Sequence, residues 1–386
     1  MQKITLLAVG VLFITGLCAC DELVSILSDK EMPNQIPDEI LIGIVLPLSG
    51  KYVESPDDPW IQRYLNGFLM AQAEINAAQR APLRFIIEDD KSTIEGALEA
   101  FDKLIHEDGV VAILGPASST QVEVAFPVAE ENRLVAIGPS SAAAGLSAIG
   151  DYVFRINQSV DKLIPRGVRL THEKLKYRRI AKLATSDDVY SQSADTLFAE
   201  SLNAIGVEVL LTETFLLRAG DYTEQLTRIK AVNPDAIIVS AQPRDMPAIM
   251  VQARQVGIGE GIPIIMPLLG SPRVQEAGDA AEGTITFSSW SNEADTPGNE
   301  AFVQGFRAKY EMEPDLFSAL TYTSVYLLSN AITNAGSTES EAIRDALAKT
   351  ADFDTVLGTF SFDAVGDPVY DPIMLIVRDG AFEVFE

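Results

Sequence analysis

The sequence predicts an α/β protein with two doubly wound lobes. Short β-rich segments alternate with longer amphipathic stretches along most of the chain, and this alternation restarts once near the middle. Such alternation is typical of parallel sheets that are covered by helices on both faces. The chain has 386 residues, of which 47% are hydrophobic and 22% charged, and this composition favours a folded protein of two or three domains.

The first unit begins with Ile40–Leu46, a continuous apolar run of the kind that forms a strand buried on both faces of a sheet. Trp60–Ala78 follows, with apolar residues at helical spacing. The next elements are expected to be strand, helix, strand, helix and strand at Leu83–Glu88, Thr93–His106, Val110–Leu114, Gln121–Glu131 and Leu134–Ile137. This order predicts a parallel sheet.

The second unit repeats the pattern. Its expected helices are Lys162–Leu175, Ser191–Ile205, Tyr222–Lys230 and Met246–Val256. Its expected strands are Ile180–Ala184, Glu208–Thr214, Asp235–Val239 and Pro263–Met266. The segments that follow are a strand near Thr284–Ser288, helices near Glu300–Tyr310, Phe317–Ala335 and Ser340–Lys349, and a β-rich tail. These segments make no third unit, so we expect them to complete the two lobes.

The charge of the chain argues against nucleic-acid binding. Lys and Arg total 29 against 55 Asp and Glu, which makes the net charge −26, and no run of basic residues offsets this balance. Lys and Arg supply most of the affinity of proteins for a phosphate backbone, and a strongly acidic chain repels one. We therefore expect no nucleic-acid partner.

The sequence also contains few of the residue patterns that catalysis requires. The two histidines, His106 and His172, are too few for a multi-histidine metal site, and both cysteines lie within the first 20 residues. Gly257–Gly261 superficially suggests a dinucleotide-binding turn, but it follows an expected helix and precedes an expected strand, which is the opposite order. Acid–base chemistry at the carboxylates of Glu88–Asp90 or Asp187–Asp188 is the alternative. We expect no enzymatic activity, no cofactor and no metal site.

The N-terminus is typical of an export signal. Met1–Lys3 carries one positive charge, and Ile4–Thr15 is an apolar run of 12 residues, which is too short to span a bilayer. Leu17–Cys20 resembles the lipobox of bacterial lipoproteins, which implies removal of residues 1–19 as a signal peptide and a lipid on Cys20. A plain signal peptide is the alternative. Residues 20–38 are then the lipidated cysteine and a tether, and the exported protein is anchored to the membrane and faces the periplasm or the outside of the cell.

Two loops are candidate ligand contacts. Val110–Thr120 and Leu134–Ala144 each contain an expected strand that ends in Gly-Pro followed by small hydroxyl residues. Ligands of open α/β sheets bind beyond the carboxyl ends of the strands, and the N-terminus of the next helix offers N–H groups to an anion. The hydroxyl residues are Ser118, Ser119, Ser140 and Ser141. The alternative is that they serve only as helix caps and turn residues.

An ordered set of short motifs carries a family resemblance. These motifs are Ile42–Gly50, Gly67–Asn76, Gly115–Gln121, Ile137–Leu146, Gly257, Ala281–Gly283 and Gly358–Asp367. Together they resemble the periplasmic leucine/isoleucine/valine-binding proteins, the type I solute-binding proteins of ABC importers, from Glu39 to Glu386. The resemblance implies two Rossmann-like lobes that close on a ligand and are joined by three hinge crossings.

The resemblance also implies the lobe boundaries. The crossings are expected near Arg155–Ser159, Gly283–Ser289 and Asp354–Gly358. Lobe 1 would then comprise residues 39–157 and 285–354, and lobe 2 residues 158–284 and 355–386.

The resemblance further implies aromatic ligand contacts in both lobes. Trp60 and Tyr52 are the candidates in the first loop, Tyr190 is the candidate in the second lobe, and Phe317 matches an aromatic residue at the start of a long helix. A position on the lobe surface is the alternative for Trp60 and Tyr52, and a plain core position is the alternative for Phe317.

Three positions depart from the family pattern. Ala142 stands where the family has a Thr, Gln242 where it has a Tyr, and Leu268 where it has the acidic residue that binds the ammonium group of the ligand. A buried ammonium group without a carboxylate is costly. Either one of the second-lobe aspartates replaces the missing acid, or the ligand lacks an ammonium group. These aspartates are Asp187, Asp188 and Asp245.

The expected function is therefore capture of a small amino acid, or of a related carboxylate or amide, between the lobes. The expected partners are this ligand, an ABC permease that recognises the closed form, and the membrane through the lipid on Cys20. A protein that presents its closed form to a sensor kinase or receptor is the alternative.

Overall fold

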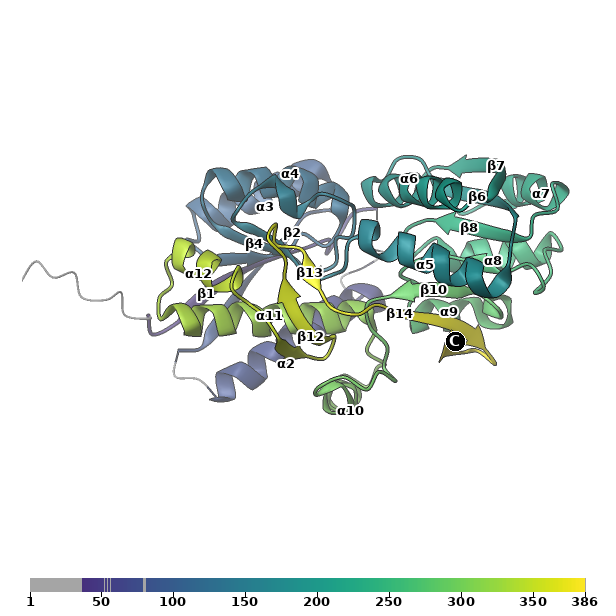
Figure 1. Ribbon diagram of the computed structural model, residues 1–386. Helices are drawn as coiled ribbons and strands as arrows, with labels where there is room; N and C mark the ends of the chain where they lie inside the picture. The colour runs from purple at the N-terminus through teal and green to yellow at the C-terminus, as the bar shows by residue number, and fades with distance from the viewer. Residues whose placement is uncertain (1–36, 52, 54, 56, 79–80, 386) are drawn as a thin grey trace, which may run out of the picture. The chain divides into compact units, whose positions relative to one another are not determined.

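The computed structural model describes residues 37–385 except 52, 54, 56, 79 and 80. The predicted signal peptide, Cys20 and Tyr52 lie outside the described residues. Within the described part, the chain forms two large sheets with their helices and one small sheet (Figure 1). This arrangement confirms the predicted fold class. No helix in these described ranges has the length and apolar character needed to cross a membrane.

The first sheet is entirely parallel and has the strand order β2-β1-β3-β4-β5. Its strands are β1 (Ile40–Leu46), β2 (Leu83–Asp89), β3 (Ala112–Leu114), β4 (Val135–Gly138) and β5 (Val153–Arg155). The central strands are buried along their whole length, as their apolar runs predict. Strand β5 was not predicted, because three residues carry too little periodicity to mark a strand.

Five helices accompany this sheet. They are α2 (Pro59–Ala78), α3 (Ile94–His106), α4 (Ser119–Glu131), α11 (Leu316–Ala335) and α12 (Ser340–Leu347). Helix α11 begins at a capping box, in which the Asp315 carboxylate accepts from Ser318 N and the Ser318 hydroxyl accepts from Asp315 N. It ends at Gly336, whose φ of 59° is the left-handed conformation that glycine adopts easily. Helices α2 and α11 pack closely, because Gly67 leaves room for the backbone carbonyl of Ser318.

The second sheet has the order β15-β14-β10-β9-β8-β6-β7, in which β14 and β15 are antiparallel and the other pairs parallel. Its strands are β6 (Arg179–Thr185), β7 (Glu208–Phe215), β8 (Ala236–Ser240), β9 (Ile264–Ile265), β10 (Ile285–Ser288), β14 (Ile373–Arg378) and β15 (Ala381–Val384). Its helices are α5 (Val160–Leu175), α6 (Val189–Ala204), α7 (Thr223–Ala231), α8 (Met246–Gln255) and α9 (Ser271–Ala277). Helix α9 was not expected from the sequence. Helix α10 (Asn299–Tyr310) lies against α2.

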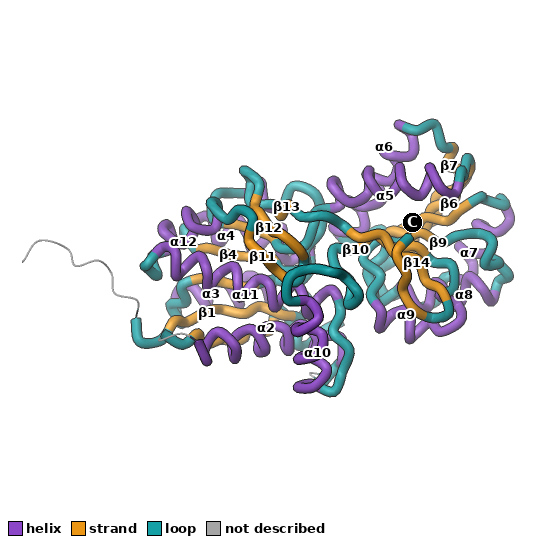
Figure 2. Tube along the Cα trace, turned by 60° about the horizontal axis from the view of Figure 1, so that its bottom comes forward, coloured by secondary structure: helices purple, strands orange, loops and turns teal. Residues whose placement is uncertain are grey.

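Two segments lie in a different lobe from the one predicted for them. Residues 285–288 were assigned to lobe 1, but they form β10, which pairs with β9 and β14 of the second sheet. Residues 355–369 were assigned to lobe 2, but most of them belong to the small antiparallel sheet of β11 (Phe353–Thr355), β12 (Gly358–Phe362) and β13 (Pro368–Val369). The β12 residue Phe362 packs against Phe154 of the first sheet at 5.1 Å between ring centroids. Figure 1 and Figure 2 both show β12 beside the first lobe and β10 beside the second.

The chain thus crosses between the lobes after β5, after β10 and after β13. Hydrogen bonds tie the three crossings together. Ser289 Oγ donates to Asn157 Oδ1 at 2.8 Å, Gln158 Nε2 donates to the Tyr370 carbonyl, and the Tyr370 hydroxyl donates to the Ile156 carbonyl at 3.1 Å. The three crossings therefore lie side by side, which is the arrangement that a hinge requires.

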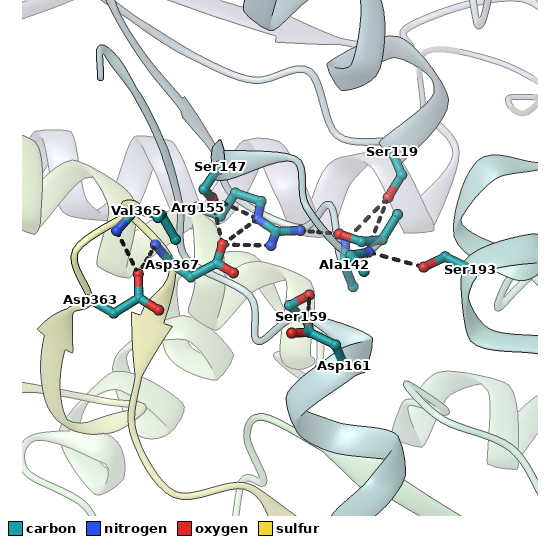
Figure 3. A network of polar contacts seen from close by, with 12 residues as sticks. Ser119, Ala142, Ser147, Arg155, Ser159, Asp161, Ser193, Asp363, Val365 and Asp367 are labelled. Carbon is teal, nitrogen blue, oxygen red and sulfur yellow. Dashed lines mark hydrogen bonds and ion pairs between the residues drawn. The ribbon is translucent and has the colours of Figure 1, made fainter. Parts of the chain in front are cut away.

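A buried ion pair joins the end of β5 to the turn that precedes β13. The Arg155 side chain is fully buried, and its Nη2 lies 2.5 Å from Oδ1 of Asp367 (Figure 3). Ser147 Oγ donates to the same carboxylate oxygen, and Arg155 Nη1 donates to the Ala143 carbonyl. Asp363 Oδ1 accepts from the backbone N–H of Asp367 at 3.0 Å and so stabilises the turn that contains Asp367. This network fixes the loop that carries Ala142 and Ala143.

Candidate functional site

A cavity with about 720 Å³ of empty space, including the part that is open to solvent, lies between side chains of both lobes. Its walls are the loops that follow β1, β2, β3, β4, β7, β8 and β9, together with α2 and the first turns of α4, α6 and α11. The structure brings all ten predicted contact positions to this cavity: Trp60, Ser118, Ser119, Ser140, Ser141, Ala142, Tyr190, Gln242, Leu268 and Phe317. That these residues bind a ligand stays a prediction.

The four serines differ in what their hydroxyls do. Ser118 is the N-cap residue of α4 and its hydroxyl contacts Gln121 Oε1, while Ser140 Oγ donates to the Ala117 carbonyl at 2.7 Å. Ser119 Oγ accepts from the N–H groups of Ala142 and Ala143, both at 3.2 Å (Figure 3 shows the bonds to this loop). Ser141 Oγ is buried and has no hydrogen-bond partner. Three serines therefore shape the two loops, and Ser141 keeps a hydroxyl available to a ligand.

Three aromatic rings form one wall of the cavity. Tyr64 and Phe317 stack with centroids 4.9 Å apart and planes 13° apart, and Trp60 meets the Tyr64 ring edge-on at 5.1 Å. The rings come from α2 and α11, which are held together at Gly67. Trp60 Nε1 is buried without a hydrogen-bond partner. Phe317, for which a core position was the alternative, packs in the core and also lines the cavity.

Tyr190 and Gln242 enter the cavity from the second lobe. Helix α6 begins two residues earlier than predicted, because Asp188 caps it by accepting from Ser191 N at 2.9 Å, and this places Tyr190 in its first turn. The Tyr190 hydroxyl is buried without a partner, and burial raises its pKa far above the ordinary value, so it stays protonated as a donor. Gln242 Nε2 donates to both carboxylate oxygens of Asp188 at 3.0 Å.

Arg244 lines the cavity and was not among the predicted contacts. It follows β8 in the second lobe, and its Nη2 lies 2.8 Å from Oδ2 of Asp58 in the first lobe. Its guanidinium carbon lies 5.4 Å from the centroid of the Trp60 ring. Its Nη1 is buried without a partner. Arg244 is not recognisable as a contact from the sequence, because a charged residue in a loop is usually exposed; its one signal is its place two residues after Gln242.

No candidate for the missing acid lines the cavity. Leu268 is buried at the expected position, and the three aspartates that were offered as replacements have other roles. Asp187 is exposed and accepts from Leu217 N, Asp188 caps α6, and Asp245 accepts from the Tyr222 hydroxyl at 2.6 Å. Among the lining residues that the structure describes, the only carboxyl group is that of Asp90.

Asp90 lies at the end of β2, where its Oδ1 accepts from Ser92 N at 2.8 Å. Burial, assisted by the neighbouring charge of Asp89, raises the pKa of Asp90 to about 7. The carboxyl therefore loses its proton at a much higher pH than an ordinary aspartate does. Arg218 and Arg244 are the lining cations within the described residues, so the described wall of the cavity is more cationic than anionic. The described part of the chain contains no group of three or more metal-ligating side chains.

Comparisons with known proteins agree with the fold and the position of the cavity. Residues 39–378 match the protein family described as periplasmic binding protein. A Pseudomonas aeruginosa leucine-, isoleucine-, valine-, threonine- and alanine-binding protein is 25% identical over 334 residues, which cover 86% of this chain and 87% of the relative.

Two solved structures illustrate the range of relatives. The Streptococcus pneumoniae branched-chain amino acid transporter substrate-binding protein LivJ, in complex with isoleucine, has a TM-score of 0.81 and 29% identity, and the match covers 90% of this chain and 98% of that one. A solute-binding protein from R. palustris, in complex with benzoate, has a TM-score of 0.81 and 22% identity over 90% of this chain and 95% of that one. At 22% identity, the similarity to the benzoate-bound protein shows the fold alone.

Proposed function

This chain belongs to the periplasmic binding protein family, a family of solute-binding proteins, and on that premise we propose that it captures a small amino acid, or a related carboxylate or amide, for an ABC importer. Its relatives bind branched-chain amino acids in one case and benzoate in another, so the proposal covers both kinds of ligand. The ligand enters the cavity between the lobes, and the closed protein presents it to the permease.

One observation carries the proposal: among the residues that the structure describes, four buried polar atoms of the cavity lining lack hydrogen-bond partners. They are Trp60 Nε1, Ser141 Oγ, Tyr190 OH and Arg244 Nη1. Leaving such a group unsatisfied costs about 1–3 kcal/mol, and natural proteins leave few of them. Two of the atoms belong to each lobe. A ligand that pairs with all four therefore stabilises the closed arrangement over an open one.

A ligand screen with one conservative variant tests this function. The exported chain is unfolded, washed and refolded to remove carried-over ligand, and thermal shifts are measured with branched-chain and aromatic amino acids and with their carboxylate and amide analogues. A ligand at about 100 times its Kd adds about 2.7 kcal/mol of stability. Tyr190→Phe removes only the unpartnered hydroxyl, so affinity should fall about fivefold while the melting temperature without ligand stays the same or rises.

Tyr177→Phe is the matched control for this variant. Its hydroxyl donates to the Val168 carbonyl at 3.1 Å, away from the cavity. Tyr177→Phe should therefore lower the melting temperature and leave affinity unchanged. Equal affinity of Tyr190→Phe and the unmodified protein for the ligand would count against this placement.

The proposed function includes a membrane anchor at Cys20. The support is the lipobox-like Leu17–Cys20 after an apolar run, which lies outside the described residues. Metabolic labelling with a radioactive fatty acid should mark the unmodified protein and not Cys20→Ser, and the variant should leave the membrane fraction. Labelling that survives Cys20→Ser would show that the lipid is elsewhere.

A further inference from the structure

We propose that the ligand is a carboxylate with an apolar, ring-sized body and no ammonium group, and that Arg244 of the second lobe binds its carboxylate. This inference rests on the proposed solute-binding function and names the substrate class of the same cavity. It goes beyond that function, which leaves amino acids, carboxylates and amides open.

All four unpartnered atoms of the cavity residues can donate hydrogen bonds. Trp60 Nε1 and Arg244 Nη1 can only donate hydrogen bonds, and the hydroxyls of Ser141 and Tyr190 can donate as well. A ligand that satisfies all four must therefore bring acceptors. A carboxylate offers about four acceptor positions on two oxygens, whereas an ammonium group offers only donors.

Arg244 keeps an unused hydrogen-bond donor because its ion pair with Asp58 involves only one guanidinium nitrogen. Nη2 binds Asp58 at 2.8 Å, and the guanidinium carbon lies 5.4 Å from the centroid of the Trp60 ring, while Nη1 remains unpaired. The Asp58 carboxylate also accepts from Trp60 N at 2.9 Å, so it is held on the side of the first lobe. Planar guanidinium groups bind carboxylates better than point charges do. Arg244 is thus positioned to bind the ligand and both lobes at once.

An ammonium group would find little to bind. Leu268 and Ala142 present alkyl groups, and Asp188 is already engaged by Gln242 and by the N-terminus of α6. Asp90 is the only described carboxyl on the wall, and it is bound to Ser92 N. Desolvating an ammonium group beside such walls is costly. The stacked rings of Tyr64 and Phe317, by contrast, suit an apolar or aromatic body.

Matched ligands test the substrate class. Isothermal titration of the refolded, ligand-free chain uses two sets of three compounds: phenylalanine, 3-phenylpropanoate and 3-phenylpropanamide, and leucine, 4-methylpentanoate and its amide. Within a set, the body is constant and only the charged groups change. We expect at least one carboxylate to bind at least 100-fold more tightly than its amino acid and at least 10-fold more tightly than its amide.

Two variants separate direct binding from an indirect effect of the interlobe ion pair. Arg244→Gln should weaken carboxylate binding at least 30-fold and change amide binding less than threefold. Asp58→Asn breaks the same ion pair but keeps the guanidinium, so carboxylate affinity should be unchanged or higher. If Asp58→Asn weakens binding as much as Arg244→Gln does, the arginine acts only by holding the lobes together, and the assignment fails.

The remaining outcomes are also decisive. Tighter binding of the amino acids would overturn the inference and leave the solute-binding function standing; a loss of that binding in Asp90→Asn would then name Asp90 as the ammonium partner. Equal binding of amides and carboxylates would likewise overturn the inference alone. If no compound binds, and mass spectrometry of the wash from the unfolded protein finds no small organic molecule, both the inference and the proposed function fail.

Discussion

Removal of the Asp367 carboxylate should destabilise the protein strongly, although this residue lies outside the cavity. In Asp367→Ala the Arg155 guanidinium loses the oxygen that lies 2.5 Å from Nη2 and 2.9 Å from Nε. Arg155 is fully buried, so water cannot replace the lost partner. The Ala143 carbonyl and the Ser147 hydroxyl remain, but neither carries a charge.

The expected magnitude follows from the burial of the pair. Breaking a buried ion pair by removing one partner costs about 3–5 kcal/mol, because the other charge is left uncompensated. An unfolding entropy of about 2.1 cal/mol/K per residue over about 340 folded residues is about 0.7 kcal/mol/K, so the melting temperature should fall by about 4–7 °C. Replacement of both partners in Arg155→Met/Asp367→Leu should recover most of this loss.

Scanning calorimetry of Asp367→Ala tests this prediction, and Asp371→Ala is the control, because it breaks an exposed ion pair instead of a buried one. Asp371 pairs with Arg166 at 3.2 Å, but the two side chains are 95% and 47% exposed, so Asp371→Ala should cost less than about 1 kcal/mol. A fall of less than 1 °C in Asp367→Ala would refute the reasoning. So would a double variant less stable than Asp367→Ala, because the loss would then come from packing and not from the unpaired charge.

Three further predictions follow from single contacts. Ser141→Ala should weaken ligand binding about fivefold without loss of stability, because the hydroxyl it removes has no partner in the ligand-free protein. Ser140→Ala should instead cost about 1 kcal/mol of stability because it removes the bond to the Ala117 carbonyl; titration calorimetry and thermal melts separate the two effects. The pKa of Asp90 in the folded protein, about 7, lies above its ordinary value of 3.8, so between these two pH values the folded state binds a proton that the unfolded state has lost. The contribution of this group to stability is therefore full below pH 4 and is lost as the pH rises to 7. Asp90→Asn should therefore become more stable than the unmodified protein as the pH rises from 5 to 8 in thermal melts, and a constant difference across this range would contradict the assignment. Gly67→Ala should lower stability by about 1–3 kcal/mol, since its Cβ would lie 2.1 Å from Thr321 Oγ1 and 2.4 Å from the Ser318 carbonyl oxygen, whereas Gly305→Ala meets only the mobile end of Met70 and should be neutral or stabilising in the same melts.

The periodic parts of the fold were predictable because their pattern is local. Ile40–Leu46 reads as a buried strand and forms β1 with the predicted bounds, and the alternation of strands and helices identified both lobes. The short strand β5 and the helix α9 were missed, since three and seven residues carry little pattern. The lobe to which β10 belongs depends on its pairing with β9 and β14, and periodicity contains no information about pairing partners.

The candidate site, like the fold, was predictable only in part. The Gly-Pro-hydroxyl loops and the missing acid at Leu268 are visible in the sequence, because their positions follow from strand ends and from the family pattern. Which serine keeps an unpaired hydroxyl is not visible there: Ser140 donates to Ala117, 23 residues earlier, and Ser141 finds no such acceptor.

The sequence by itself determined the α/β class, the two-lobe order and the strand-end loops that bear the candidate contacts, since each depends on spacing along the chain. Only the tertiary structure decided that Arg244 lies against Asp58, which is 186 residues earlier in the sequence, and against Trp60, and that its Nη1 is buried without a hydrogen-bond partner. The physical reason is that hydrogen bonding and desolvation act between atoms that touch, and the contacts between the lobes arise only when the chain has folded.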